Sequence, residues 1–189
     1  MKTVIILSAQ RHGTTTLCDR FNDHPEVTVL YEAFNPGKQG CLRSGVNSRT
    51  DLTEHIGSFF RDNPHLQNTF LVFKVFPRQL CSIEQLLALR HNKKFLILRR
   101  PLKDAYESYY RAMTSGNWGT TPSIQKEHEE NNVVDWRAPP LAYEHYVMEL
   151  EQWFSRVENA CVAAGANIDF LEFSDVIAPN FDVNRFLDF

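Results

Sequence analysis

The sequence has no long apolar run. The longest purely apolar run near its start is residues 4–7, whereas a membrane helix needs about 20 apolar residues and the core of a signal peptide about 7 to 15. It also lacks an excess of positive charge, since 20 Lys and Arg stand against 23 Asp and Glu and the net charge is -3. We therefore expect a cytoplasmic protein with no membrane span, which does not hold nucleic acid through many phosphate contacts.

Patterns typical of metal centres and disulfide frameworks are absent as well. The sequence has four cysteines that are far apart and form no C-x-x-C pair: Cys18, Cys41, Cys81 and Cys161. Its seven histidines form no H-x-x-x-H or H-E-x-x-H pattern. We expect free thiols and no metal site. With 43% hydrophobic and 23% charged residues, the 189-residue composition is that of one folded domain, which we expect to span 1–189.

Short apolar runs alternate with segments of helical spacing. Residues 4–7, 69–75, 95–98 and 168–173 predict strands, the first three being typical of strands buried on both faces of a parallel sheet. Apolar residues at steps of three and four predict helices after the strands at 4–7 and 69–75, and a long helix from 143 to 164 that ends at Gly165. Residues 181–189 predict a short helix, and 33–50 and 115–140 predict long loops. This order predicts an α/β fold with an open, mostly parallel sheet flanked by helices.

The turn after the first strand is predicted to bind an anion. Residues 8–16 read S-A-Q-R-H-G-T-T-T and open a helix, where unpaired N–H groups and the helix dipole favour phosphate or sulfate. Gly13 allows close backbone approach, and Arg11 supplies a cation. Thr14 stands where a nucleoside triphosphatase has its P-loop lysine, and no glycine lies five residues before Gly13. We therefore expect an anion that is held without a metal.

A second basic motif follows the strand at 95–98. Arg99 and Arg100 lie at its exit, Pro101 is expected at the first helical position, and Ser108 lies about two turns into the helix that follows. The guanidinium fork of an arginine and the hydroxyl of a serine suit one phosphate. Because the carboxyl ends of parallel strands meet at one edge of a sheet, the two motifs predict a ligand with phosphates at two separated positions.

These motifs resemble those of the sulfotransferases that use 3′-phosphoadenosine 5′-phosphosulfate (PAPS). In that superfamily an R/K-x-G-T/S-T/S-x loop binds the 5′-phosphosulfate, and an Arg-x-Pro…Ser segment binds the 3′-phosphate. Q-R-H-G-T-T-T-L-C at 10–18 matches the first, with His12 where a small residue is usual. R-R-P at 99–101 with S-Y-Y-R-A at 108–112 matches the second. H-P-E-V at 24–27 and Y-E-A-F-N-P at 31–36 resemble the bacterial and carbohydrate-type branch.

The resemblance, which runs to about residue 112, implies a P-loop-like fold and a PAPS-dependent transferase. PAPS would be the cofactor, 3′,5′-ADP the product, and the acceptor a hydroxyl or amine of a small molecule, carbohydrate or lipid. The implied cofactor contacts are Arg11, His12, Gly13, Thr14, Thr15, Thr16, Arg99, Arg100 and Ser108. The chain stops near where family members have further residues that complete the cofactor pocket, so the domain is expected to be short at its carboxyl end.

The resemblance also assigns catalytic roles. Glu32 matches the position of the base and is expected at the end of the second strand. The aryl and steroid branch instead uses the histidine of K-T-H-x-P, and here the comparable stretch is K-V-F-P at 74–77, in which Phe76 replaces that histidine. This departure favours Glu32 as base. It makes Lys74, with Arg11, the group expected to stabilise charge on the transferred sulfuryl.

Several alternatives stay open at the level of sequence. His12 either lines the acceptor pocket or covers the loop, Lys74 either acts in the site or extends to water, and either Arg99 or Arg100 holds the 3′-phosphate. The rival functions are a degenerate nucleotide-binding module without transfer activity and, with less support, a P-loop-type kinase, which the missing lysine after Gly13 argues against. The sequence indicates neither the acceptor nor the oligomeric state.

Overall fold

The computed structural model describes residues 2–34, 52–62, 64, 70–77, 79, 83–115 and 140–189. Five strands, all parallel, form one sheet in the order β2-β3-β1-β4-β5. Their bounds are β1 Lys2–Leu7, β2 Val27–Val29, β3 Phe70–Val75, β4 Asn92–Arg99 and β5 Ile168–Glu172. The predicted α/β class with a parallel sheet is confirmed. The long loops expected at 33–50 and 115–140 lie almost wholly outside the described residues, as do Cys41 and Cys81.

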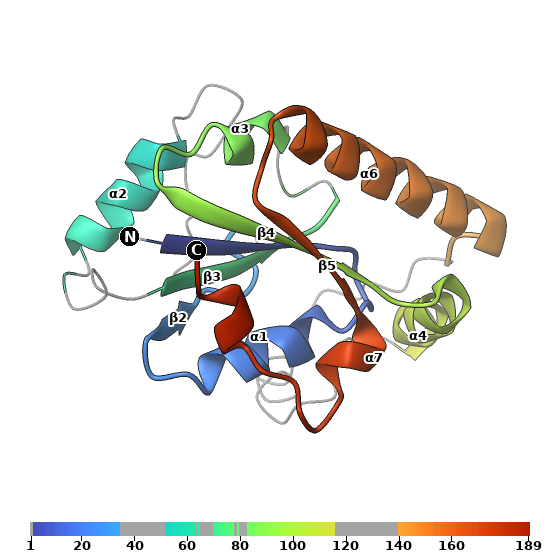
Figure 1. The fold of residues 1–189 in the computed structure, drawn as a ribbon. Coiled ribbons are helices and arrows are strands. Elements are labelled where there is room, and N and C mark those ends of the chain that lie inside the picture. Colours follow the sequence, from blue (N-terminus) through green and yellow to red (C-terminus); the bar gives the residue numbers. More distant parts are fainter. Residues whose placement is uncertain are drawn as a thin grey trace.

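Helices cover both faces of the sheet (Figure 1). They are α1 Thr14–Asn22, α2 Leu52–Asp62, α3 Ile83–Leu87, α4 Leu102–Ser115, α6 Tyr143–Ala163, α7 Phe173–Val176 and the 3-10 turn η2 Asn184–Phe186. α2, α3 and α6 lie on one face, and α1, α7 and η2 lie on the other. α4 starts beyond the carboxyl end of β4, so the two basic motifs share that edge of the sheet.

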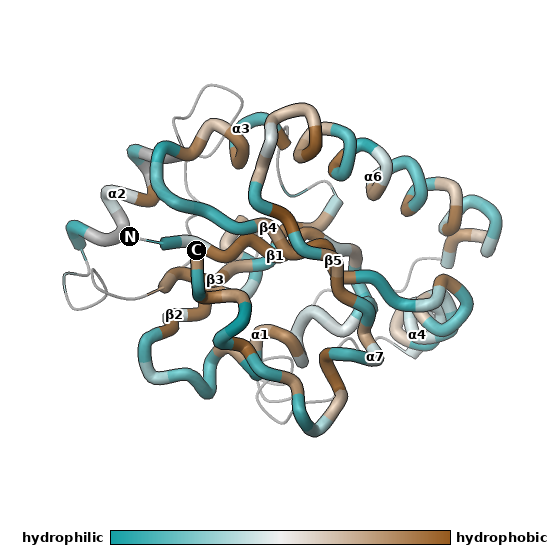
Figure 2. Tube along the Cα trace, in the orientation of Figure 1, coloured by the Kyte–Doolittle hydropathy of each residue, from teal (hydrophilic) through white to brown (hydrophobic). Residues whose placement is uncertain are grey.

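The alternation of side chains along β1 divides the core in two. Ile5 and Leu7 pack with α3 and α6, whereas Val4 and Ile6 pack with α1, α7 and η2. All four are fully buried, and the middle of the sheet is mostly apolar (Figure 2). Burial of each such side chain contributes about 1.5 to 3 kcal/mol, so both faces of the sheet hold β1 and the loop that follows it in place.

Several predicted boundaries are corrected by the structure. The long helix was expected at 143–164 and spans Tyr143–Ala163, with Gly165 at φ 59 directly after it. The strand expected at 168–173 ends at Glu172 because α7 begins with Phe173. Pro101 precedes α4, and its carbonyl accepts the first helical hydrogen bond from Ala105, so it is not the first helical residue.

The prediction of a carboxyl-terminal helix at 181–189 is wrong. Only the turn η2 Asn184–Phe186 forms there. The Asp182 carboxylate accepts hydrogen bonds from the backbone N–H and side-chain amide of Asn184, which offers the chain a local alternative to a helix. Phe186 and Leu187 are buried against the α1 face of the sheet. The apolar spacing therefore reflects the packing of an irregular segment.

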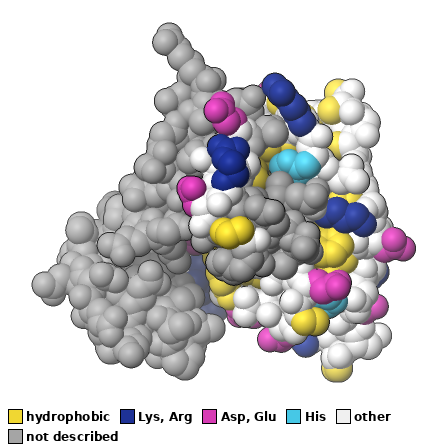
Figure 3. Space-filling model, turned by 90° about the vertical axis from the view of Figure 1, so that its left-hand side faces the viewer, with side chains coloured by type: hydrophobic (Ala, Val, Ile, Leu, Met, Phe, Trp, Pro, Cys, Tyr) yellow, Lys and Arg dark blue, Asp and Glu magenta, His cyan; other side chains and the backbone are white. Residues whose placement is uncertain are grey.

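The amino-terminal edge of the sheet faces the viewer in Figure 3. Among the described side chains on that face, Lys and Arg are interspersed with Asp and Glu. No large patch of one charge sign gathers on the described part of this face. The arginines described below lie at the opposite edge, because they follow the carboxyl ends of β1 and β4.

Candidate active site

The loop between β1 and α1 is tied to both neighbouring strands. The Ser8 hydroxyl donates a hydrogen bond to the carbonyl of Leu98 at 2.7 Å, and the Ser8 N–H donates to the carbonyl of Val75 at 3.3 Å. α1 then starts after Gly13 with no side-chain cap and no acidic residue in its first turn. The N–H groups at a helix start have no intrahelical acceptor, so this end of α1 favours an anion.

Gly13 is required for a reason that the sequence did not reveal. Its φ is 86, and a Cβ atom there would lie 2.1 Å from the ring of Phe173. The space beside its Cα is therefore filled by the first residue of α7. The group that approaches the Gly13 Cα in this structure is an aromatic side chain of the protein itself.

We expect Gly13→Ala to destabilise the protein by about 2 to 4 kcal/mol, because left-handed strain adds to a steric clash with Phe173. Gly165→Ala is the matched control, since Gly165 also has a positive φ of 59 but nothing lies within 4 Å of its Cβ position. Urea unfolding of both variants measures the difference. Equal losses of stability would show that the Phe173 contact does not constrain the loop.

The two predicted basic motifs meet. Arg11 Nε donates to Ser108 Oγ at 2.9 Å, and Arg100 Nη1 lies 3.4 Å from the carbonyl oxygen of Arg11. Ser108 is buried on α4, and the Arg100 guanidinium lies 4.9 Å from the centre of the Phe173 ring. Burial, together with the charges of Arg100 and Arg111, lowers the pKa of Arg11. The guanidinium groups of Arg11, Arg100 and Arg111 repel one another, and a bound anion would reduce this repulsion.

Arg99 faces a different part of the molecule. Its Nη2 forms an ion pair with Glu158 on α6, and its guanidinium lies 4.8 Å from the centre of the Phe154 ring. Of the two adjacent arginines, the structure thus brings Arg100 to Arg11 and Ser108, and holds Arg99 against α6. Arg111, one turn after Ser108 on α4, was not singled out from the sequence, although the matched S-Y-Y-R-A segment contains it.

His12 is fully buried and lies under the loop. Its Nδ1 accepts a hydrogen bond from the Arg100 N–H at 3.1 Å, and its ring centre lies 5.6 Å from that of Phe154. Burial, with the charges of Arg100 and Arg99, lowers the pKa of His12 to about 4. Of the two sequence interpretations, the geometry favours a neutral imidazole that covers the loop from within, because the side chain does not reach an open surface.

The buried histidine makes stability depend on pH. The pKa of His12 is about 4 in the folded protein and about 6.5 when unfolded, so the unfolded chain binds more protons between these values and stability falls as the pH is lowered from 6.5 to 4. In His12→Asn, whose amide oxygen can replace Nδ1 as acceptor, this loss should shrink by up to about 3 kcal/mol. Urea unfolding across this pH range measures it, and unchanged pH dependence would contradict the assignment.

His91 provides the comparison for that experiment. Burial, together with the charges of Lys93 and the N-terminus, also lowers the pKa of His91 to about 4. Its Nε2 lies 2.7 Å from the Thr3 hydroxyl at the amino-terminal edge of the sheet. His91→Asn should therefore reduce the acid sensitivity independently, by a comparable amount because the pKa of His91 is lowered to the same value, and the two effects should add.

Lys74 and Glu32 lie together on the other side of the loop. Lys74 is 4% exposed; its Nζ donates to Thr15 Oγ1 at 3.1 Å and lies 3.7 Å from Glu32 Oε1. The rings of Tyr31 and Phe76 lie 5.8 and 5.3 Å from the same Nζ. The side chain thus turns inward to the first turn of α1 and does not extend to water.

The backbone before Glu32 explains how the carboxylate reaches this position. β2 ends at Val29, and Tyr31 adopts a left-handed conformation with φ 48, while its carbonyl accepts a hydrogen bond from the Lys74 N–H at 2.8 Å. Glu32 therefore follows the second strand closely but does not belong to it. The Tyr31 hydroxyl donates to Asp19 on α1 at 2.8 Å, which fixes the turn against that helix.

Gln79 is a site residue that the sequence did not indicate. Its Nε2 donates to Glu32 Oε2 at 3.1 Å, and its Oε1 accepts from the Phe76 N–H at 2.9 Å. The second bond fixes which end of the amide faces the carboxylate. A single polar residue five positions after Lys74 carries no pattern of its own, so only the three-dimensional arrangement reveals it.

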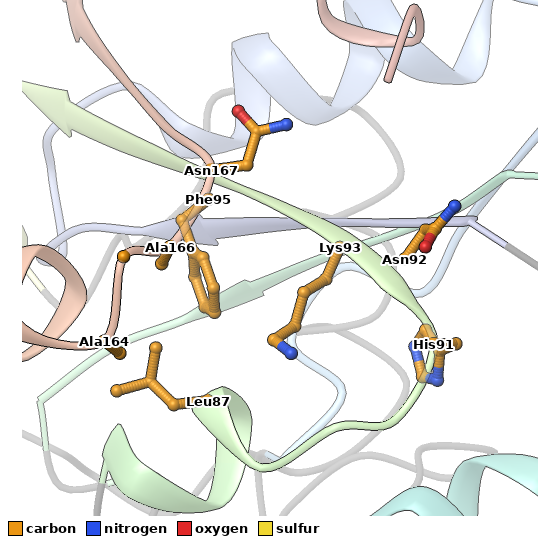
Figure 4. Close-up of a pocket in the computed structure, with 9 residues that line it drawn as sticks. Leu87, His91, Asn92, Lys93, Phe95, Ala164, Ala166 and Asn167 are labelled. Atoms are coloured by element: carbon orange, nitrogen blue, oxygen red, sulfur yellow. The ribbon is translucent and has the colours of Figure 1, made fainter.

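A pocket of about 270 Å³ lies elsewhere, at the amino end of β4 (Figure 4). It is lined by His91, Asn92, Lys93, Phe95, Leu87 and the segment 164–167. Lys93 Nζ donates to the Leu89 carbonyl there, at 2.6 Å. Because the arginines and Glu32 follow the carboxyl ends of the strands, this pocket is not part of the site.

The described residues contain neither a metal-binding cluster nor a membrane-spanning helix. Within them, no three His, Cys, Asp or Glu side chains gather as a metal ion would require. Among the described helices, none has both the length and the apolar character that crossing a membrane demands. Cys18 and Cys161 are buried free thiols.

Comparison with known proteins adds fold-level evidence. No protein-family model matches the sequence, and no curated protein does. The crystal structure of a sulfotransferase from Alicyclobacillus acidocaldarius aligns with a TM-score of 0.53 and 18% identity, over 93% of this chain and 74% of that one. A sugar kinase from a Janibacter species aligns at 14% identity over 84% and 97%, but its TM-score of 0.35 supports no argument. At 18% identity, the first likeness shows a shared fold with that sulfotransferase.

Proposed function

We propose that the protein is a sulfotransferase that takes its sulfuryl group from PAPS. The observation that carries this proposal is the meeting of Arg11, Arg100 and Ser108 beside the uncapped start of α1, with the Lys74–Glu32 pair on the other side of the same loop. It provides two cationic positions and an adjacent carboxylate. The fold shared with a known sulfotransferase supports it.

The hydrogen-bond donors of the site fit an adenosine nucleotide that carries phosphates at the 3′ and 5′ positions of its ribose. The N–H groups of Gly13, Thr14, Thr15 and Thr16 would hold the 5′-phosphosulfate, because a helix start offers donors and a favourable dipole. On the other side, Arg100 with Arg11 and Ser108 would hold the 3′-phosphate. Charge-assisted hydrogen bonds of this kind are roughly twice as strong as neutral ones.

The catalytic roles follow from charge and position. When bound, PAPS supplies a sulfuryl group that is transferred in line to an acceptor oxygen or nitrogen, leaving 3′,5′-ADP. Glu32 would accept the proton of the acceptor, and Lys74 would stabilise the charge that develops. Arg11, which the resemblance assigns to the transferred sulfuryl, is bonded to Ser108 and would act at the 3′-phosphate instead. Lys74 also fixes Glu32 and Thr15 relative to each other. Protein cations and N–H groups supply the charge stabilisation, so the proposed transfer requires no metal.

The test is incubation of the protein with radiolabelled PAPS and a panel of hydroxyl and amine acceptors drawn from small molecules, carbohydrates and lipids. The proposal predicts labelled acceptor together with 3′,5′-ADP. Binding of 3′,5′-ADP with no transfer to any acceptor would instead favour a nucleotide-binding module. Phosphate transfer from ATP would favour the kinase alternative.

A further inference from the structure

Tyr146, in the first turn of α6, has a hydroxyl group with no evident structural purpose. The residue is 6% exposed, and its Oη atom is buried with no hydrogen-bond partner among the residues that the structure describes. A buried hydroxyl without a partner is costly, and such groups are uncommon in folded proteins. Phenylalanine would fill the same space without this cost. The unpartnered hydroxyl therefore indicates that Tyr146 forms a hydrogen bond with a ligand.

The ring of Tyr146 is held firmly. It stacks on Tyr109 with 5.0 Å between ring centres and 26° between planes, and it lies 5.3 Å from the Tyr106 ring. On α4, Tyr109 directly follows Ser108. The Ser108 hydroxyl accepts the hydrogen bond from Arg11. The stack thus joins the start of α6 to the helix that forms one side of the arginine cluster. The phenol is fixed before any ligand arrives.

The phenol lies within electrostatic reach of the cluster. Burial raises the pKa of Tyr146, while the charges of Arg100 and Arg11 act in the opposite direction. Ser108 Oγ accepts from Arg11 and so keeps its own hydrogen for donation. Two guanidinium groups, a serine hydroxyl and a phenol all have hydrogens to donate. A phosphate is a ligand that only accepts, and it can take up all of these donors at once.

We propose that the Tyr146 hydroxyl is a further ligand of the anion held by Arg11, Arg100 and Ser108, so that it contributes to the preference for nucleotides with a 3′-phosphate. The inference rests on the proposed function, because it takes that anion to be the 3′-phosphate. It assigns a specificity role to a helix that lies outside both basic motifs. The start of α6 then forms one wall of the cofactor site.

The decisive variant is Tyr146→Phe, which removes one oxygen and keeps the stacked ring. Affinity for 3′,5′-ADP, measured by calorimetry, should fall about tenfold, as expected for the loss of one hydrogen bond to a charged group. Affinity for 5′-AMP, which has no 3′-phosphate, should change less than twofold. The unfolding temperature of the free protein should stay the same or rise, because the variant removes an unpartnered buried hydroxyl.

Tyr143→Phe is the matched control. Its ring belongs to the same aromatic cluster, 5.1 Å from that of Tyr106, but the residue is 39% exposed. It should change neither affinity. An unchanged preference for 3′,5′-ADP in Tyr146→Phe, or a lower unfolding temperature of the free variant, would overturn the role given to Tyr146 while leaving the proposed function intact. A wild-type protein that does not prefer 3′,5′-ADP to 5′-AMP would overturn both.

Discussion

Glu32→Gln should lower the rate of sulfuryl transfer by about 10²- to 10⁴-fold, the usual contribution of a general base. Gln has the same shape, and its one amide oxygen can keep one of the two contacts of the carboxylate, which lies 3.7 Å from Lys74 and 3.1 Å from Gln79. What it cannot do is take a proton from the acceptor. Affinity for 3′,5′-ADP should therefore stay within a few-fold of the wild-type value, and the loss should appear in kcat.

Glu26→Gln provides the control, because Glu26 is exposed and lies just before β2, on the same segment of the chain. It should transfer sulfuryl groups at the wild-type rate. Rates and 3′,5′-ADP affinities of the three proteins are measured side by side, together with their unfolding temperatures. If Glu32→Gln loses affinity as much as rate, Glu32 is a structural partner of Lys74 and not the base.

Arg100→Met should weaken binding of 3′,5′-ADP by about 10- to 150-fold, since hydrogen bonds between charged groups contribute about 1.5 to 3 kcal/mol. Met keeps an unbranched apolar side chain beside the Phe173 ring, on which the Arg100 guanidinium lies, and the backbone N–H that bonds to His12 is unchanged. The loss should be confined to ligands with a 3′-phosphate. Affinity for 5′-AMP should change little, and calorimetry with both nucleotides separates the two effects.

Arg99→Met distinguishes the adjacent arginines. Arg99 is bound to Glu158 on α6, so its removal should lower the unfolding temperature but leave the affinity for 3′,5′-ADP within about twofold. The opposite pattern, in which Arg99→Met loses the nucleotide and Arg100→Met retains it, would place the 3′-phosphate on the α6 side of β4. The variants carry the same net charge change, so differences in general electrostatics cancel.

Some of the fold could be predicted because it follows from local pattern. The middle parts of β1, β3 and β4 are buried on both faces, and such stretches are mostly apolar, so their runs were visible. α6 has one apolar face over its whole length, and Gly165 marks its end. β2 spans only Val27–Val29 and is half-buried, so it left no run to find. Phe186 and Leu187 have helical spacing but are placed by tertiary packing.

The site residues also divide into those that local sequence pattern predicts and those that only the tertiary structure places. The position of both basic motifs at one edge of the sheet could be predicted, because they follow neighbouring parallel strands. The direct contact of Arg11 with Ser108 was not predicted, because the sequence assigned these two residues to separate phosphates. Gln79 and Tyr146 could not be predicted either, since each reaches the site through a fold that brings distant segments together. The spacing of R-R-P also left the choice between Arg99 and Arg100 open. The structure distinguishes the two by the direction in which each side chain leaves the end of β4, towards Glu158 for Arg99 and towards Arg11 for Arg100. The proposed function therefore assigns the 3′-phosphate to Arg100.

The central claim is that the 5′- and 3′-phosphates of one nucleotide both bind at the carboxyl edge of the sheet. A crystal structure of the protein with 3′,5′-ADP tests it most directly. We predict the 5′-phosphate at the N–H groups that open α1, and the 3′-phosphate in contact with Arg100 and Ser108. A nucleotide bound at another face, or one whose 3′-phosphate touches neither of these side chains, would contradict the account.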